Sequence, residues 1–363
     1  MDLREVDKKI SEATGRIDFY SCLTPLNQKE EEEKFFLLFE KGEKYNPVFK
    51  YKEHDLAQEK KDLEELLKGL DAADPLHGVF IKKIEFILTQ AELLEASDED
   101  FAQVAVKLHG EPDKETIDTA LGILREGRDT GYVFPDETVT PEEMCSILSE
   151  DLKEAGIDWK CTLSRKLIPK VTVSGKDRTI YVNDRISYTQ EEIERLRIHE
   201  IKVHIYRGAN GAIQPFHIFA EGLAGYNETE EGLAIVAEER TGVLKEDTRQ
   251  MKLYSGRAVC VHHSLEKGFY EVFDALREFF PDRMAYRLAE RGKRGLVDTS
   301  SRGGLTKGFH YISGWQKVKR FVEENGDLSI LYVGKIGVDD VGAARELLSG
   351  GVLKAPEHLP EFI

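Results

Sequence analysis

Two histidines and a glutamate form the first group of residues whose types and spacing suggest chemistry. They lie in the segment HEIKVH, as His199, Glu200 and His204. Two imidazoles, a more distant carboxylate and a glutamate beside the first imidazole are the components of hydrolytic zinc sites. The alternative is two unrelated histidines on an amphipathic helix. Apolar residues on more than one face predict a buried segment, where an unpaired carboxylate costs several kcal/mol, so the metal site is favoured.

The spacing of the two histidines predicts a local deformation. In the familiar H-E-x-x-H helix the histidines are four residues apart and lie only about 40° apart around the axis. Here the spacing is five residues. A regular helix would separate the two rings by roughly 140°, too far for both to reach one metal through Zn–N bonds of ~2.1 Å. The sequence therefore predicts a π-type bulge between His199 and His204, or a helix that unwinds before His204.

A third metal ligand has several candidates. The tetrapeptide EGLA occurs twice, beginning at Glu221 and at Glu231. Glu231 is followed by a helical run that would fix its carboxylate on a rigid element, whereas Glu221 leads into a turn. Glu228 and Glu230 also compete, although acidic residues at a helix start are often only a solvated face. Local sequence favours Glu231.

Several motifs together carry a resemblance to a known family. They are HEIKVH, RGAN at 207–210, QPFH at 214–217, TEEGLA at 229–234, YNPVFKY at 45–51, KRG at 293–295 and DTS at 298–300. In this combination the chain is similar to the microtubule-associated tyrosine carboxypeptidase family, which includes prokaryotic proteins described by a QEGLA motif. The resemblance spans about residues 45 to 315. The chain departs from the name motif at Glu230, which stands in the place of Gln.

The resemblance implies a zinc metallocarboxypeptidase with one Zn²⁺ per chain. It implies that His199, His204 and Glu231 bind the zinc and that Glu200 is catalytic. Such a metal leaves a position for water and lowers the pKa of that water to about 7, so Glu200 would take its proton and pass it to the leaving amine. The substrate would be the C-terminal tail of a peptide or protein. The family implies Tyr or Phe as the residue removed.

A basic stretch in this acidic chain is a candidate site for the substrate carboxylate. Arg291, Lys293 and Arg294 lie close together, and an exopeptidase needs a cation, preferably arginine, for the terminal carboxylate. The alternative is a solvated loop. Tyr311 is a candidate hydrogen-bond donor to the oxyanion.

A second group of possible metal ligands comprises Cys260, His262 and His263. They alternate with Val259 and Val261, a pattern typical of a half-buried strand. This pattern favours packing in the core over metal binding.

The predicted fold is α+β and mostly helical: a zincin-like metallopeptidase whose metal-binding helix follows a small antiparallel sheet. Thr140 and Thr189 each begin a capping box, the second of them at the start of the HEIKVH helix. Alternation at 170–173 and 178–182 predicts a β-hairpin. Residues 328–333 fit either a strand or a buried helix start. Helices are predicted at 5–15, 28–41, 53–70, 77–95, 98–109, 140–154 and 282–294.

Length and composition restrict the remaining possibilities. A chain of 363 residues permits two domains, an N-terminal helical region at 1–112 and a zinc metallopeptidase domain at 113–363, although one unit is also possible. A net charge of −17 argues against nucleic acid as a partner. Four scattered cysteines favour a reducing compartment, and the absence of a run of ~20 apolar residues argues against a membrane span. We therefore expect a cytoplasmic protein; the sequence does not indicate its oligomeric state.

Two other functions are compatible with the same residues. One is a zinc-binding regulatory or interaction protein without activity, and the other is a zinc endopeptidase. A closed structural zinc site needs four protein ligands, whereas this chain offers three and a glutamate of the catalytic type. The enzyme is therefore favoured over the silent binding protein.

Overall fold

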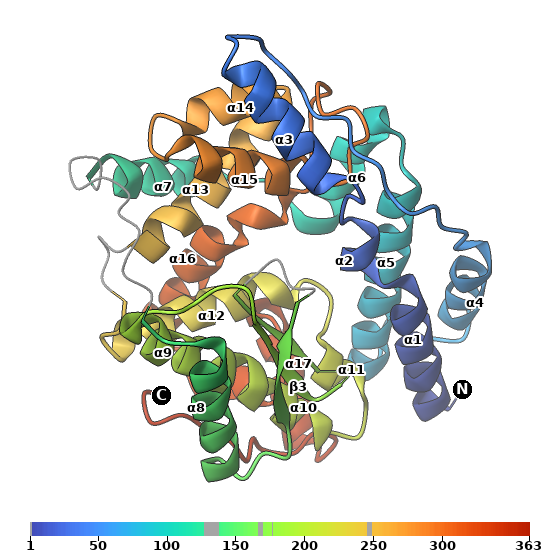
Figure 1. The fold of residues 1–363 in the computed structure, drawn as a ribbon. Coiled ribbons are helices and arrows are strands. Elements are labelled where there is room, and N and C mark those ends of the chain that lie inside the picture. Colours follow the sequence, from blue (N-terminus) through green and yellow to red (C-terminus); the bar gives the residue numbers. More distant parts are fainter. Residues whose placement is uncertain (1, 127–137, 166–169, 176, 245–248) are drawn as a thin grey trace.

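The protein consists mainly of α-helices with one small sheet (Figure 1). The structure is a computed structural model and describes residues 2–126, 138–165, 170–175, 177–244 and 249–363. Helix α12 (Tyr226–Arg240) crosses the middle of the molecule, with α3 and α13 to α15 above it and the sheet, α8 and α10 below it. The prediction of an α+β, mostly helical fold is confirmed, and the zincin-like relationship stays a prediction.

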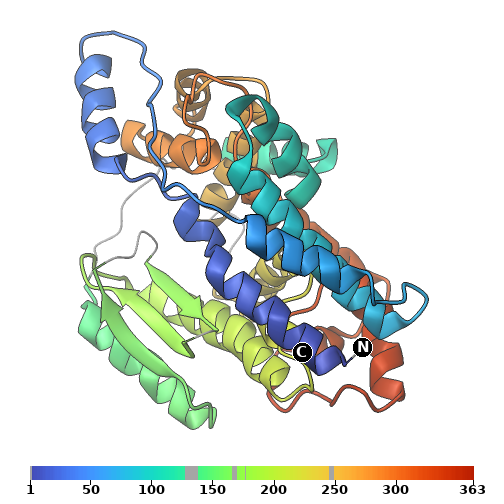
Figure 2. The same cartoon turned by 90° about the vertical axis from the view of Figure 1, so that its right-hand side faces the viewer.

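The five predicted N-terminal helices are present, whereas the short helix at Phe19–Cys22 and the helix at Lys114–Glu126 were not predicted. Asp74 caps α5 with Pro75 in the first turn, and the Ser97 hydroxyl caps α6. The helix predicted at 53–70 is shorter than expected. Figure 2 shows α1 and α4 side by side. The elements are α1 (Leu3–Ile17), α2 (Phe19–Cys22), α3 (Gln28–Phe39), α4 (Ala57–Leu67), α5 (Pro75–Glu95), α6 (Asp98–His109) and α7 (Lys114–Glu126).

The sheet has three strands in the order β1-β3-β2. Strands β2 (Val171–Ser174) and β3 (Thr179–Asn183) are antiparallel, which confirms the predicted hairpin. Strand β1 (Lys160–Ser164) pairs with β3 in parallel, so the prediction of an antiparallel sheet is wrong and the sheet is mixed. Sequence reasoning missed β1 because its residues are exposed or half-buried along its whole length and carry no alternating apolar pattern.

The predicted deformation of the HEIKVH helix is confirmed. Both expected capping boxes form, at Thr140 before α8 (Pro141–Glu154) and at Thr189 before α9 (Gln190–Leu196). Helix α9 continues without a break into a π-helix, η2 (Arg197–Ile205), and then into α10 (Tyr206–Ala212). The π-helix contains both motif histidines.

The C-terminal part corrects one sequence interpretation and decides between the two alternatives of another. Cys260 lies in helix α13, so the strand expected around Val259 and Val261 is wrong; both valines are buried because neighbouring helices enclose α13. The segment predicted as a strand or a buried helix start forms a largely buried 3₁₀-helix at Leu328–Tyr332. The elements are α11 (Ile218–Glu221), α13 (Arg249–Ser264), α14 (Phe269–Leu276), α15 (Asp282–Lys293), η3 (Thr306–Phe309), α16 (His310–Glu323), η4 (Leu328–Tyr332), η5 (Val338–Asp340) and α17 (Val341–Ser349).

Helix α12 is enclosed and packs directly on α16. Gly232, the glycine of TEEGLA, faces Gly314 so closely that a Cβ atom on either would overlap the backbone of the opposite helix. Residues 232–238 are buried on every face of the helix. The small residues therefore set the depth of α12, which also packs against η2.

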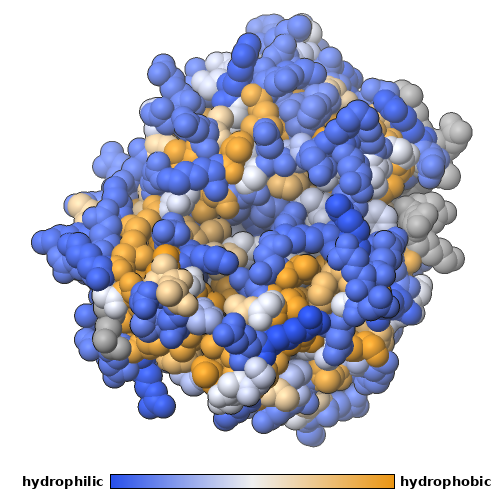
Figure 3. All heavy atoms as spheres, turned by 180° about the vertical axis from the view of Figure 1, so that it is seen from behind, coloured by the Kyte–Doolittle hydropathy of each residue, from blue (hydrophilic) through white to orange (hydrophobic). Residues whose placement is uncertain are grey.

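The motifs at 45–51 and 293–300 meet in space. Val48 and Asp298 form an antiparallel bridge, and the Thr299 hydroxyl donates to the carbonyl of Pro47. These contacts join residues before position 112 to residues after it. The predicted division into two domains at that position stays a prediction. Within the described ranges, none of the helices is both long and apolar enough to span a membrane. On the face opposite Figure 1, polar side chains predominate and apolar ones gather in patches (Figure 3).

Candidate functional site

The two motif histidines and one glutamate converge between η2 and α12. The rings of His199 and His204 lie on the same side of the π-helix, with centroids 4.8 Å apart. Glu231 reaches them from α12, and one possible ligand atom from each of the three residues lies within 4.8 Å of the others. Bonds of about 2.0–2.2 Å to one zinc need ligand atoms within roughly 4.4 Å of one another, so this spacing is only slightly wider.

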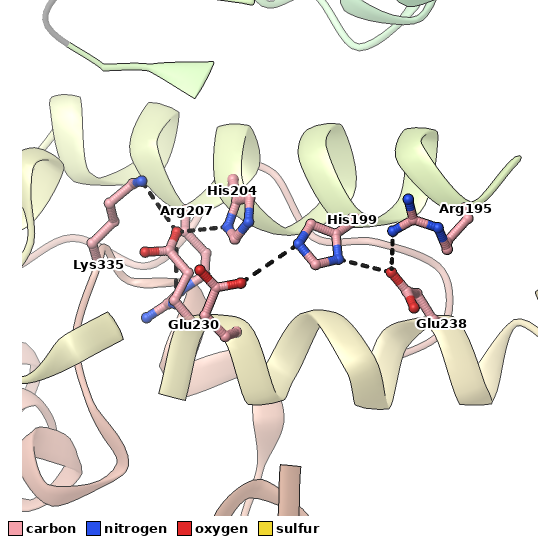
Figure 4. Close-up of polar contacts among 8 residues, drawn as sticks. Arg195, His199, His204, Arg207, Glu230, Glu238 and Lys335 are labelled. Atoms are coloured by element: carbon pink, nitrogen blue, oxygen red, sulfur yellow. Dashed lines mark hydrogen bonds and ion pairs between the residues drawn. The ribbon is translucent and has the colours of Figure 1, made fainter. Parts of the chain in front are cut away.

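Each histidine is also held by a second carboxylate from α12 (Figure 4). Nδ1 of His199 lies 2.7 Å from Oε1 of Glu238, and Nδ1 of His204 lies 3.0 Å from Oε1 of Glu230. These contacts leave Nε2 of both rings directed to the shared centre. Metal-binding histidines characteristically engage a carboxylate through the nitrogen that does not bind the metal.

Two half-buried cations compensate the two supporting carboxylates. Nη1 of Arg195 lies 3.3 Å from Glu238, and Nζ of Lys335 lies 3.1 Å from Glu230. Burial acts to raise the pKa of Glu230, but Lys335 and His204 outweigh it and hold that pKa well below its usual value. Glu230 is therefore ionised at neutral pH and can accept a hydrogen bond from the His204 ring.

Glu231 has the properties of an available ligand. Burial acts to raise its pKa, yet the neighbouring rings of His199 and His204 lower that pKa to about 2. Its Oε2 atom is buried and has no hydrogen-bond partner among the described residues. Burial likewise acts to lower the pKa of His199, but Glu231 and Glu238 outweigh it and raise that pKa well above its usual value. The donor set of two imidazole nitrogens and one carboxylate oxygen fits Zn²⁺.

The other three glutamates considered as ligands have different partners. Glu221, at the end of α11, accepts a hydrogen bond from the Ser11 hydroxyl. Glu228 binds Ser313 at 2.6 Å and Lys317 at 3.1 Å. Glu230 supports His204, as described above. Of the four glutamates considered as the third ligand, Glu231 is the one that lies in the group with both histidines.

Glu200 lies beside the first histidine of the cluster. Its side chain is half-buried, and its charge is among the causes that raise the pKa of His199. It also contributes to the raised pKa of Arg195. The carboxylate is therefore close to the centre defined by the three ligands and is not itself one of them.

A cavity of about 60 Å³ is lined by four cationic side chains. They are Arg257, Arg291, Arg294 and Lys307, so two of the predicted substrate residues lie here. Burial and the nearby charge of Arg257 lower the pKa of Arg291 to about 10. The charge of Glu231 acts on both Arg291 and Lys307, which places the cavity beside the histidine cluster.

The other two predicted substrate residues have different surroundings. Lys293 is completely buried, and its ammonium donates to the carbonyls of Ser264, Ser301 and Gly303 at 3.2, 2.8 and 3.0 Å, and to a fourth, that of Lys267. These bonds give Lys293 a structural role, because they join the end of α13 to the loop between α15 and η3.

Tyr311 does not line the cavity itself but contacts Arg257, which does. Its ring stacks on Tyr254 with centroids 4.6 Å apart, and the guanidinium of Arg257 lies 4.4 Å from its centroid. Tyr311 therefore supports Arg257.

The group at Cys260, His262 and His263 does not form a metal cluster in the described part of the chain. The Cys260 thiol points into the core and donates to the carbonyl of Leu288. His262 is exposed, and Nδ1 of His263 lies 3.2 Å from Nζ of Lys267. The expectation of core packing therefore holds for Cys260, in a helix instead of a strand.

Sequence reasoning missed Glu238, Arg195, Lys335, Arg257 and Lys307. A signal existed for Glu238, because it follows Glu231 by seven residues, or two helical turns, and therefore shares its face of α12. The other four reach the site from separate elements, and no local pattern marks them.

The fold and the cluster define a candidate metal centre in an α+β protein. A family model described as microtubule-associated tyrosine carboxypeptidase matches residues 34–363. The chain belongs to this family, which confirms the resemblance found in its motifs.

Two relatives illustrate the extent of similarity. Microtubule-associated tyrosine carboxypeptidase 1 of Rattus norvegicus is 29% identical over 177 residues, which are 47% of this chain and 36% of that protein. The protein of the same name from Homo sapiens is 30% identical over 159 residues, which are 42% of this chain and 33% of that protein. The matched part of the chain thus spans about a third of the length of these relatives.

Proposed function

We propose that this protein is a zinc-dependent carboxypeptidase that removes the C-terminal residue from a peptide or protein tail. The observation that carries the proposal is the convergence of His199, His204 and Glu231, with each imidazole supported by its own carboxylate. Relatives that bear the name tyrosine carboxypeptidase support terminal tyrosine as the preferred residue.

In this proposal His199, His204 and Glu231 hold the zinc. The bound metal would supply Lewis acidity, which polarises the peptide carbonyl and lowers the pKa of water. Glu238 and Glu230 fix the orientation of the two rings through their Nδ1 atoms.

Glu200 is the proton carrier. Its carboxylate accepts a proton from the attacking water and then passes it to the amine nitrogen that leaves. Arg291 and Arg257, on the cavity side of the cluster, bind the terminal carboxylate of the substrate. That contact would restrict cleavage to the last peptide bond.

The test is mass spectrometry of a peptide library with varied C-terminal residues, incubated with zinc-loaded protein. We expect the wild type to remove single terminal residues, and Glu200→Gln to be inactive while it still binds one zinc per chain. His204→Ala should lose the metal. Peptides amidated at the C-terminus serve as matched controls and should resist cleavage, because they lack the carboxylate.

Other outcomes would point to other functions. Internal cuts, or equal cleavage of amidated peptides, would indicate an endopeptidase. Zinc bound without any cleavage would favour a binding protein. An active Glu200→Gln variant would remove Glu200 from its assigned role.

A further inference from the structure

The cation-lined cavity contains a residue from a segment that the family match does not include. That match begins at residue 34, whereas Tyr20 in helix α2 forms part of the cavity wall. Its neighbour in the cavity wall is Lys307, which belongs to the 3₁₀-helix η3. The N-terminal segment, which lies outside the matched residues, therefore supplies a part of the cavity wall.

The four cations of this cavity form no salt bridge within the described ranges, although the charge of Glu231 acts on Arg291 and Lys307. None of the salt bridges found there involves Arg257, Arg291, Arg294 or Lys307, although the chain as a whole carries a charge of −17. Nε of Arg294 is buried and has no hydrogen-bond partner in that part of the structure. All four side chains are half-buried. Cations that are partly removed from water and lack an ion-pair partner favour a bound anion, so the cavity is suited to an anionic ligand.

Tyr20 contacts one of the four cations, Lys307, in two ways. The ammonium of Lys307 donates to the phenolic oxygen of Tyr20 at 2.7 Å and also lies 4.7 Å from the centre of its ring. Tyr20 is 44% exposed, so its ring has one face on Lys307 and another side in contact with solvent. This position lets it limit the space in front of the cations.

The segment that carries Tyr20 is anchored. Phe19 is buried and packs edge-on against Tyr20, with ring centroids 5.3 Å apart. The buried Asp7 of α1 accepts hydrogen bonds from the backbone amides of His217 and Ile218, at 2.6 and 3.0 Å. Tyr20 is therefore a fixed wall and not part of a loosely attached flap.

We propose that Tyr20 is a specificity-determining residue, whose ring closes one side of the cavity and whose hydroxyl positions Lys307 to bind the terminal carboxylate of a peptide. This inference rests on the proposed function for its substrate class. The contribution of a hydrogen bond to a charged group is about 1.5–3 kcal/mol, which corresponds to roughly 10- to 100-fold in affinity.

The test combines kinetics with binding. With zinc-loaded protein and a peptide ending in tyrosine, we expect Tyr20→Ala to raise KM about tenfold or more while kcat stays within about twofold. Tyr20→Phe keeps the ring and should show an intermediate rise in KM. Tyr45→Phe is the matched control, because it removes a phenol that binds Glu31 at 2.7 Å and lies outside the cavity lining.

Binding is measured on metal-free protein, so that it does not depend on turnover. The probes are the same peptide with a free C-terminal carboxylate and with a C-terminal amide. We expect the acid to bind more tightly than the amide, and Tyr20→Ala to reduce this difference. Thermal unfolding of each variant, together with the ring-retaining Tyr20→Phe, separates loss of the contact from loss of the fold.

The outcomes separate this inference from the proposed function. If the wild type cleaves nothing but Tyr20→Ala still weakens binding of the acid, the proposed function fails and the role of Tyr20 stands. If Tyr20→Ala binds the acid as the wild type does, or if acid and amide bind equally, the role of Tyr20 is overturned.

Discussion

At the scale of single residues, helix α12 contributes three glutamates to the histidine cluster. Glu231 contributes the third ligand atom, while Glu230 and Glu238 hold the two imidazoles in place. Glu231 and Glu238 share one face of α12 because they lie two turns apart, and Glu230, one residue before Glu231, contacts His204. The TEEGLA helix is therefore as important to the centre as the helix with the histidines.

Glu238→Gln should weaken zinc binding without unfolding the protein. The amide keeps the size of the side chain but loses the charge that orients His199, and loss of such partners typically reduces metal affinity 10- to 100-fold. Competition with a chromophoric chelator measures this change. Glu239→Gln is the matched control, since Glu239 accepts a hydrogen bond from Nε1 of Trp315 at 2.8 Å and lies outside the cluster. Equal zinc affinity in Glu238→Gln and the wild type would contradict the assigned role.

At the scale of elements, α12 is held at its depth by two facing glycines. Gly232→Ala should destabilise the protein by about 1–3 kcal/mol, because the added Cβ would overlap the backbone at Gly314 and force the helices apart. Urea denaturation measures the loss. Gly122→Ala, in α7, is the matched control: nothing lies within 4 Å of its added Cβ, so alanine should stabilise that helix by roughly 0.5–1 kcal/mol. A neutral Gly232→Ala would show that the helices can separate freely.

The sequence allowed prediction of those elements whose signals are local. The five-residue spacing of His199 and His204 predicted a π-type bulge or an unwound helix, because a regular helix would keep the two rings apart, and the structure has the π-helix. The capping boxes at Thr140 and Thr189 marked two helix starts. Strand β1 was missed because no apolar alternation marks it. The helix around Cys260 was mistaken for a strand, because a helix buried on several faces shows no clear period.

The candidate site was predictable to the same local extent. Choosing Glu231 over Glu221 rested on the helix that follows it, and the structure places Glu231 with the histidines. The cavity was beyond local reasoning, because Arg257 and Lys307 join Arg291 through packing of α13, α15 and η3. No window of sequence contains all three.

At the scale of the whole molecule, α1 is fastened to the body of the protein through α11. Asp7→Ala removes the acceptor for the amides of His217 and Ile218, and we expect it to lower the unfolding free energy by about 1–3 kcal/mol. Denaturant titration is the measurement. Glu12→Ala is the control on the same helix: its partner Lys8 is 3.9 Å away and both side chains are exposed, so the effect should stay below about 0.5 kcal/mol. Equal effects of both substitutions would argue against an anchored α1.

Lys83 should make the free energy of unfolding depend on pH in the alkaline range. This buried lysine in α5 donates to the carbonyl of Gly222 at 2.5 Å, and burial lowers its pKa from 10.5 to about 8. Below about pH 8 the folded and unfolded states are both protonated, so the fold bears the full cost of a buried cation. Between these two pKa values the unfolded state binds more protons than the folded state, and the free energy of unfolding therefore rises with pH.

Lys83→Met removes this dependence, because methionine fills a similar volume without a charge. We expect the wild type to gain roughly 1–3 kcal/mol relative to Lys83→Met between neutral pH and a pH near 10.5. Urea denaturation of both proteins at the two pH values gives the difference, in which titration of all other groups cancels. Lys82→Met, at the exposed neighbouring position, should show no such change. If the difference in the free energy of unfolding between the wild type and Lys83→Met did not change with pH, Lys83 would have its ordinary pKa inside the protein.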